Sequence, residues 1–145
     1  MRPICSAASM LCVAALLLVS APHAAVAQET LCGKPKSSPQ ALYEHLAKVD
    51  KLREMGSSPE YVALEDGTDG TLWTFTLPAH PAHPAVVCRR IVERRGMLDI
   101  PTSIQCNGPQ AACAKLESDF ETLNKRMIQE LYDQQRQQQQ QRQQK

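Results

Sequence analysis

Two segments of the chain carry apolar side chains at helical spacing. In the first segment the apolar positions, three or four residues apart, are Leu42, Leu46, Val49, Leu52 and Met55. This spacing predicts an N-terminal helix over residues 39–55 with one buried side. Ser38 and Pro39 suit the N-cap and the first helical position, and Gly56 suits the residue that follows the helix end.

The second helical pattern follows Pro109, which again suits a first turn. Its apolar positions are Cys113, Leu116, Phe120, Leu123 and Met127, and Ile128 and Leu131 extend the same stripe. The pattern predicts a C-terminal helix that presents one apolar side to a core.

Between these helices the apolar positions follow the period of two that is typical of strands. The alternation is clearest at residues 71–77 and 97–106, and strands are predicted at residues 60–65, 71–77, 85–94 and 97–106. Short turns join them, with Asp66–Gly70 in the first hairpin and Arg95-Gly96 in the last. Consecutive strands joined by short turns form an antiparallel meander. We therefore predict a two-layer α+β domain in which both helices cover one face of a four-stranded sheet.

The turn at Arg95-Gly96 also predicts the register of the last hairpin, because paired residues then have numbers that sum to about 191. Cys88 faces position 103 in this register, so it does not face Cys106. Pro101 lacks a backbone donor, which indicates that the last strand lies at an edge of the sheet.

The first residues have the pattern of a secretory signal peptide. Arg2 precedes an apolar run at residues 10–19, and the small residues Ala25 and Ala27 follow it. Cleavage after Ala27 is predicted. The run is shorter than the ~20 residues that span a bilayer, so the mature chain is not expected to span a membrane. We predict a periplasmic or secreted protein whose single disulfide-bonded domain covers residues 28–133.

Removal of residues 1–27 leaves four of the six cysteines, namely Cys32, Cys88, Cys106 and Cys113. An even number of cysteines in an exported chain indicates disulfides. Because the register separates Cys88 from Cys106, and because Cys106 and Cys113 flank the junction of strand and helix, the favoured pairs are Cys106–Cys113 and Cys32–Cys88.

Residues 134–145 contain nine Gln and three cations and no apolar side chain. Such a tail has nothing to bury, so it is predicted to be either disordered or a frayed extension of the preceding helix. Residues 28–145 carry 15 cationic and 15 acidic side chains. This balance argues against nucleic acid as a partner, because such binding needs a basic excess.

Two groups of residues could carry a binding function. His80 and His83 lie in the proline-rich segment 78–84 and could share a metal ion, although two imidazoles do not complete a site. Arg89, Arg90, Arg94 and Arg95 surround Ile91 on one predicted strand, and a bulge near Arg89-Arg90 would change which face each occupies. Arginines of this kind favour contact with the carboxylates of a protein partner.

The chain contains no phosphate-binding glycine loop, no nucleophile elbow and no zinc-protease motif. We therefore predict no catalytic residues and no cofactor. The leading hypothesis is a non-enzymatic binding module, an adaptor or inhibitor with a protein partner in the cell envelope. A metal-binding protein that uses His80 and His83 is the alternative, and a small hydrolase is the third.

Overall fold

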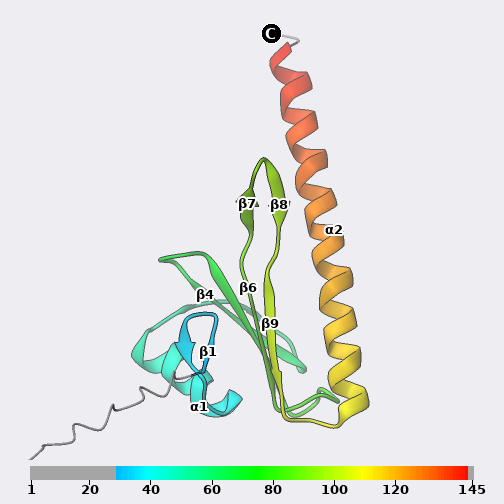
Figure 1. Cartoon of the computed structure of the whole chain (residues 1–145). Helices are drawn as coiled ribbons and strands as arrows, with labels where there is room; N and C mark the ends of the chain where they lie inside the picture. The colour runs from blue at the N-terminus through cyan, green and yellow to red at the C-terminus, as the bar shows by residue number, and fades with distance from the viewer. Residues whose placement is uncertain (1–28, 144–145) are drawn as a thin grey trace, which may run out of the picture.

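The computed structural model describes residues 29–143 (Figure 1). The predicted signal peptide therefore lies outside the described residues. The elements in chain order are β1 (Thr30–Leu31), β2 (Lys34–Pro35), α1 (Pro39–Glu44), the π-helical turn η1 (His45–Val49), β3 (Arg53–Ser57), β4 (Tyr61–Asp66), β5 (Thr71–Thr76), β6 (Ala85–Arg89), β7 (Val92–Arg94), β8 (Met97–Asp99), β9 (Thr102–Cys106) and α2 (Gln110–Gln143).

An antiparallel sheet lies at the centre of the fold, with the strand order β3-β4-β5-β6-β9. The meander is confirmed, but the sheet has five strands where the sequence predicted four. The additional strand is β3, which pairs with β4 at an edge. The opposite edge is β9, as the position of Pro101 indicated.

The predicted register of the last hairpin is confirmed, because Cys88 faces Ser103 and Arg94 faces Met97. Each of its two predicted strands is divided in the structure, into β6 and β7 and into β8 and β9. The interruption lies at Pro101, which is opposite Arg90 and has no N–H to donate to it. Across it the Arg90 amide reaches the Pro101 carbonyl only at 3.4 Å. Beyond this point β7 and β8 pair only with each other.

The two helices cover opposite faces of the sheet, so the fold has three layers and the predicted two-layer arrangement is wrong (Figure 1). One core joins Leu42 of α1 and Leu46 of η1 to Trp73 and Phe75. The other core joins Leu116 and Phe120 of α2 to Ala85 and Val87. Because β6 contributes to both cores, Val86, Val87 and Cys88 are all buried, although consecutive side chains of a strand point to opposite faces.

The N-terminal helix differs from the prediction. Ser38 caps α1 by accepting a hydrogen bond from the Ala41 amide at 3.2 Å, and Pro39 begins the helix. The helical segment continues only through η1, however, and Lys51 then has a φ of +53°. A left-handed residue ends a helix, so the chain reverses there and residues 53–57 pair as β3 instead of extending the helix.

The second helix is longer than its apolar stripe. It extends through the glutamine-rich segment to Gln143, and every side chain from Gln134 to Gln143 is exposed. Of the two alternatives for this tail, the structure therefore has the helical one.

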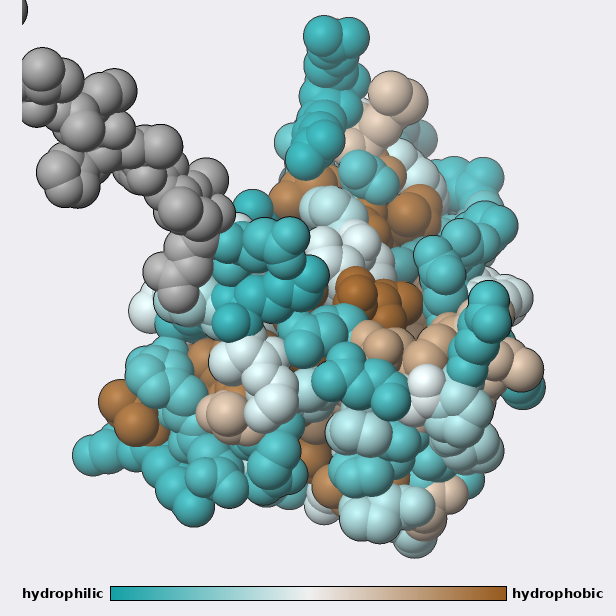
Figure 2. Space-filling view, turned by 60° about the horizontal axis from the view of Figure 1, so that its bottom comes forward, coloured by the Kyte–Doolittle hydropathy of each residue, from teal (hydrophilic) through white to brown (hydrophobic). Residues whose placement is uncertain are grey.

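Among the helices of residues 29–143, none has the length and hydrophobicity that a membrane span requires. On the face shown in Figure 2, hydrophobic side chains reach the surface in separate patches with polar side chains between them.

Candidate functional site

Both favoured disulfides are present. Cys32–Cys88 joins the N-terminal arm to the central strand β6, and its Cα atoms are 6.3 Å apart. Cys106–Cys113 joins the end of β9 to the first turn of α2, with a Cα separation of 5.8 Å. Cys88 is fully buried in the core beneath α1. The two bridges thus fix the two helical layers to the sheet, and they leave no free thiol among the described residues.

The structure does not bring His80 and His83 together as a ligand pair. The Ala82 amide donates to His80 Nδ1 at 3.0 Å, so the proton of the neutral ring is on Nε2, which contacts the Tyr61 hydroxyl at 2.6 Å. His83 Nδ1 instead donates to the Thr76 carbonyl at 2.8 Å. His80 lines a cavity against α2 and His83 lines one against α1. Within residues 29–143, no three metal-ligating side chains lie together.

Arg89 differs from the other three predicted arginines because it is half-buried between the sheet and α2. Its guanidinium lies 5.2 Å from the centre of the Phe120 ring and donates to Asn124 Oδ1 at 3.1 Å. Asn124 Nδ2 in turn donates to the Thr102 hydroxyl at 2.8 Å. Burial lowers the pKa of Arg89 from its ordinary value. This residue therefore joins α2 to the sheet and is not available to a partner.

Arg90, Ile91, Arg94 and Arg95 lie beyond the sheet, on or next to the ribbon, the name used here for β7 and β8. The two strands join at Arg95 and Gly96, whose φ angles are +55° and +78°. Two consecutive positive φ angles define the tight hairpin turn that the sequence predicted. All three arginines are exposed, and Arg90 forms an ion pair with Asp69 at 3.2 Å.

The ribbon is held beside α2, as Figure 1 shows. The Leu98 amide donates to the Tyr132 hydroxyl at 2.9 Å. We call residues 90–100 together with residues 125–143 the projection, and the other described residues the body. The projection exposes two apolar side chains, Ile91 just before the ribbon at 42% and Met97 on the ribbon at 64%.

The projection and the body have opposite charge. The projection contains seven Lys and Arg residues and four Asp and Glu residues, whereas the body contains seven and eleven. The cations of the projection include Arg94 and Arg95 at the ribbon tip. An exposed apolar side chain next to paired arginines can contact an acidic surface and bury apolar area in the same step.

Three residues at or near the projection were not predicted as site residues, namely Met97, Tyr132 and Asn124. Met97 was assigned only to a strand, and Tyr132 lies just beyond the apolar stripe. The sequence signal for Asn124 was its place on the apolar stripe, where it is a polar residue next to Leu123. In the structure it is almost fully buried. A buried amide needs hydrogen-bond partners, and here they are Arg89 and Thr102.

Comparisons with known protein families, with curated proteins and with solved structures gave no match to this chain.

Proposed function

We propose that this chain is a non-enzymatic binding module of the periplasm or the secreted space, and that its projection contacts the acidic surface of a protein partner. The observation that carries the proposal is Arg95, which occupies a left-handed position at the exposed tip of the ribbon. This conformation costs an ordinary L-residue about 1–2 kcal/mol. Asn or Gly would fit the turn with less strain. Lys51 has the same conformation in the body, so what distinguishes Arg95 is its place at the exposed tip next to a second exposed arginine, Arg94.

The surroundings of Arg95 support a protein partner. Arg94 precedes the turn and the exposed Met97 follows it. Arginine and methionine are enriched at protein interfaces, where the guanidinium can bind a carboxylate through two parallel hydrogen bonds. The excess of cations over the whole projection would also accelerate the encounter with an acidic partner.

The compartment is proposed on two grounds. The first is the signal-peptide pattern that ends at Ala27. The second is the pair of disulfides, which fit an oxidising environment. The metal-binding alternative is less favoured because both ring nitrogens of His80 already make hydrogen bonds that hold its own loop.

The test separates the recognition role of Arg95 from its place in the fold. The partner is captured from periplasmic extract with the disulfide-bonded chain, identified by mass spectrometry, and its affinity is measured with the purified chain. We expect Arg95→Asn to keep or raise the melting temperature, because Asn tolerates a positive φ. The same change should weaken binding about tenfold, because it removes a central arginine from the interface.

Lys51→Asn is the matched control. Lys51 has a φ of +53° and is exposed, so the change removes one charge from the same backbone conformation. It lies in the body, and it should leave the affinity unchanged. Equal affinities for the two variants, or an affinity that does not fall as salt rises, would contradict the proposal.

A further inference from the structure

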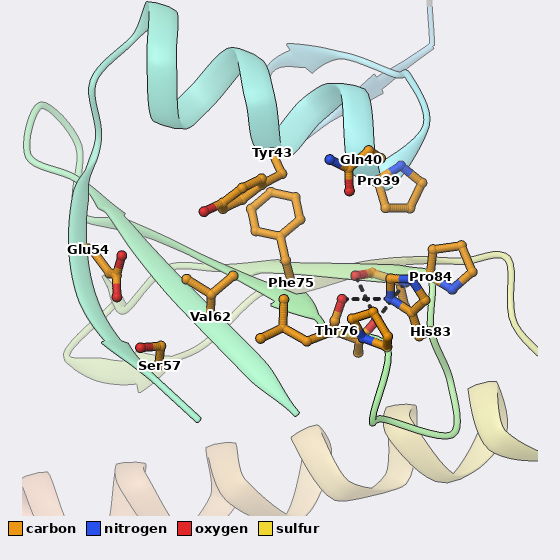
Figure 3. Close-up of a pocket in the computed structure, with 13 residues that line it drawn as sticks. Pro39, Gln40, Tyr43, Glu54, Ser57, Val62, Phe75, Thr76, His83 and Pro84 are labelled. Atoms are coloured by element: carbon orange, nitrogen blue, oxygen red, sulfur yellow. Dashed lines mark hydrogen bonds between the residues drawn. The ribbon is translucent and has the colours of Figure 1, made fainter. Parts of the chain in front are cut away.

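A cavity of about 490 Å³ lies between α1 and the sheet, separate from the ribbon. Val62 and Phe75 form its floor and both are almost fully buried. The Tyr43 ring of α1 packs edge-on against the Phe75 ring, with the ring centres 5.2 Å apart. Figure 3 shows this aromatic pair beneath α1, with β3 at one end of the cavity and the loop of His83 and Pro84 at the other. A cavity of this size with an apolar floor suits a small organic group.

A bulge in the edge strand supplies the polar side chains at one end. Glu54 faces Leu64 and Ser57 faces Val62, with one additional residue, Met55, between them. In a regular strand, residues 54 and 57 would point to opposite faces. The bulge changes the phase, so both lie on the face that α1 covers, and both line the cavity (Figure 3). Bulges commonly direct side chains toward functional sites in this way.

His83 supplies a hydrogen-bond acceptor at the other end. Its Nδ1–H donates to the Thr76 carbonyl at 2.8 Å, which fixes the ring and its tautomer. In the neutral ring, Nε2 then carries a lone pair, and it makes no hydrogen bond with any described residue. Gln40, which also lines the cavity, has already used its amide to donate to Glu44 at 3.0 Å.

The charge of the lining is one-sided. Among the residues that the structure describes, no Lys or Arg lines the cavity, and Glu54 is its only carboxylate. Glu54 forms no ion pair with the residues that the structure describes, because the neighbouring Arg53 pairs with Glu65 on the other face of the sheet. The cavity therefore offers a carboxylate without an ion pair and an imidazole nitrogen around an aromatic floor. A complementary ligand brings a positive charge, a donor and an apolar stem.

We propose that this cavity binds an organic cation, a primary ammonium or a guanidinium on an apolar stem. The stem packs on Phe75 and Val62 while the cation donates to the Glu54 carboxylate and the Ser57 hydroxyl. A free amine and the lysine or arginine side chain of a polypeptide share this chemistry. The proposal does not depend on the role of the projection, because none of the lining residues belongs to the projection.

Titration calorimetry with three probes of similar size tests the charge requirement. The probes are 2-phenylethylamine, the neutral 2-phenylethanol and the anionic 3-phenylpropionate, and a capped Gly-Lys-Gly peptide forms a fourth arm. We expect a cationic probe to bind at least about tenfold more tightly than the neutral and anionic probes, since charge-assisted hydrogen bonds are the stronger ones. Binding of the amine indicates a free ligand, and binding of the peptide alone indicates a polypeptide. Both results support the proposal.

Two matched variants locate the site. Glu54→Gln removes the charge but keeps the shape, and it should reduce cation affinity about tenfold. Glu93→Gln removes an equally exposed strand carboxylate from the ribbon and should change nothing. Chemical-shift changes in NMR should appear at Phe75 and His83 in the parent protein. Equal binding of all probes, no binding of either cationic probe, or equal losses in the two variants would overturn the proposal.

Discussion

Two parts of the fold run through both the body and the projection, namely the hairpin from β6 to β9 and the helix α2. Within the body β6 is apolar on both faces, and α2 contributes Leu116 and Phe120 to a core. Beyond Pro101 the ribbon has one partner, α2, and α2 ends in exposed glutamines. The same elements are therefore packed and crosslinked at one end, and polar and exposed at the other.

This difference assigns stability and recognition to different parts of the chain. Burial and disulfide closure stabilise the body. Ile100 is the one buried side chain of the projection, so most of its other side chains can vary without loss of the fold, and its strained Arg95 can be tolerated. Substitutions at the two ends of the shared elements should therefore have very different effects on the free energy of unfolding.

The largest effect is expected from the Cys32–Cys88 bridge, which closes a separation of 56 residues in the body. Replacement of both cysteines by Ala should reduce the free energy of unfolding by about 4 kcal/mol from loop entropy alone. The Cys106–Cys113 bridge spans only seven residues, and its loss should cost about 2.5 kcal/mol by the same relation. Urea unfolding of the two double variants measures both values. A larger loss for the short loop would contradict this order.

A pair of leucines on α2 tests the comparison within one helix. Leu116 is fully buried in the body, so Leu116→Ala should cost about 3 kcal/mol through lost burial and a cavity. Leu131 is half-buried in the projection, and Leu131→Ala should cost about 1 kcal/mol or less. The same chemical change is thus measured at two positions by urea unfolding. Equal costs would mean that the projection packs as tightly as the body.

The contrast also explains which parts of the fold were predictable. The turn at Arg95-Gly96 is local, and it gave the correct register and, through that register, both cysteine pairs. The capped start of α1 at Ser38 was local as well. The end of that helix was not, because Leu52 and Met55 continue the apolar stripe while β3 forms only through pairing with β4.

The layers were mispredicted for a related reason. An apolar stripe shows that a helix is buried on one side, but not which face of the sheet it covers. The run Ala85 to Cys88 carried the missing signal, since four consecutive buried residues need cover on both faces. The cavity between α1 and the sheet depends on β3 and its bulge, so no local pattern revealed it. Arg94 and Arg95 could be predicted as candidate interface residues because they are adjacent in sequence.

Asp69 lies at the boundary between the two regions and makes the comparison pH-dependent. Hydrogen bonds from Thr71, and then the charge of Arg90, hold the pKa of Asp69 below its usual 3.8. When the folded pKa lies below the unfolded pKa, the stabilisation is fully present above the unfolded pKa. It is lost as the pH falls through the folded pKa. We expect Asp69→Asn to unfold more easily than the parent at pH 6, with the difference shrinking as the pH falls below 3.8. Melting curves across this range provide the measurement.

The smallest effect is expected at the end of the projection. Removal of residues 134–145 should change the melting temperature by no more than about 1–2 °C, because every side chain from Gln134 to Gln143 is exposed. Its strongest contact, Arg136 with Asp133, lies between exposed side chains, and such pairs contribute little. The melting temperature of the shortened chain should also be the same at low and high protein concentration. If the deletion instead lowers the melting temperature more at high than at low protein concentration, this helical end packs against a second copy in the parent protein. Sedimentation velocity of both chains distinguishes that outcome from a purely local contribution to α2.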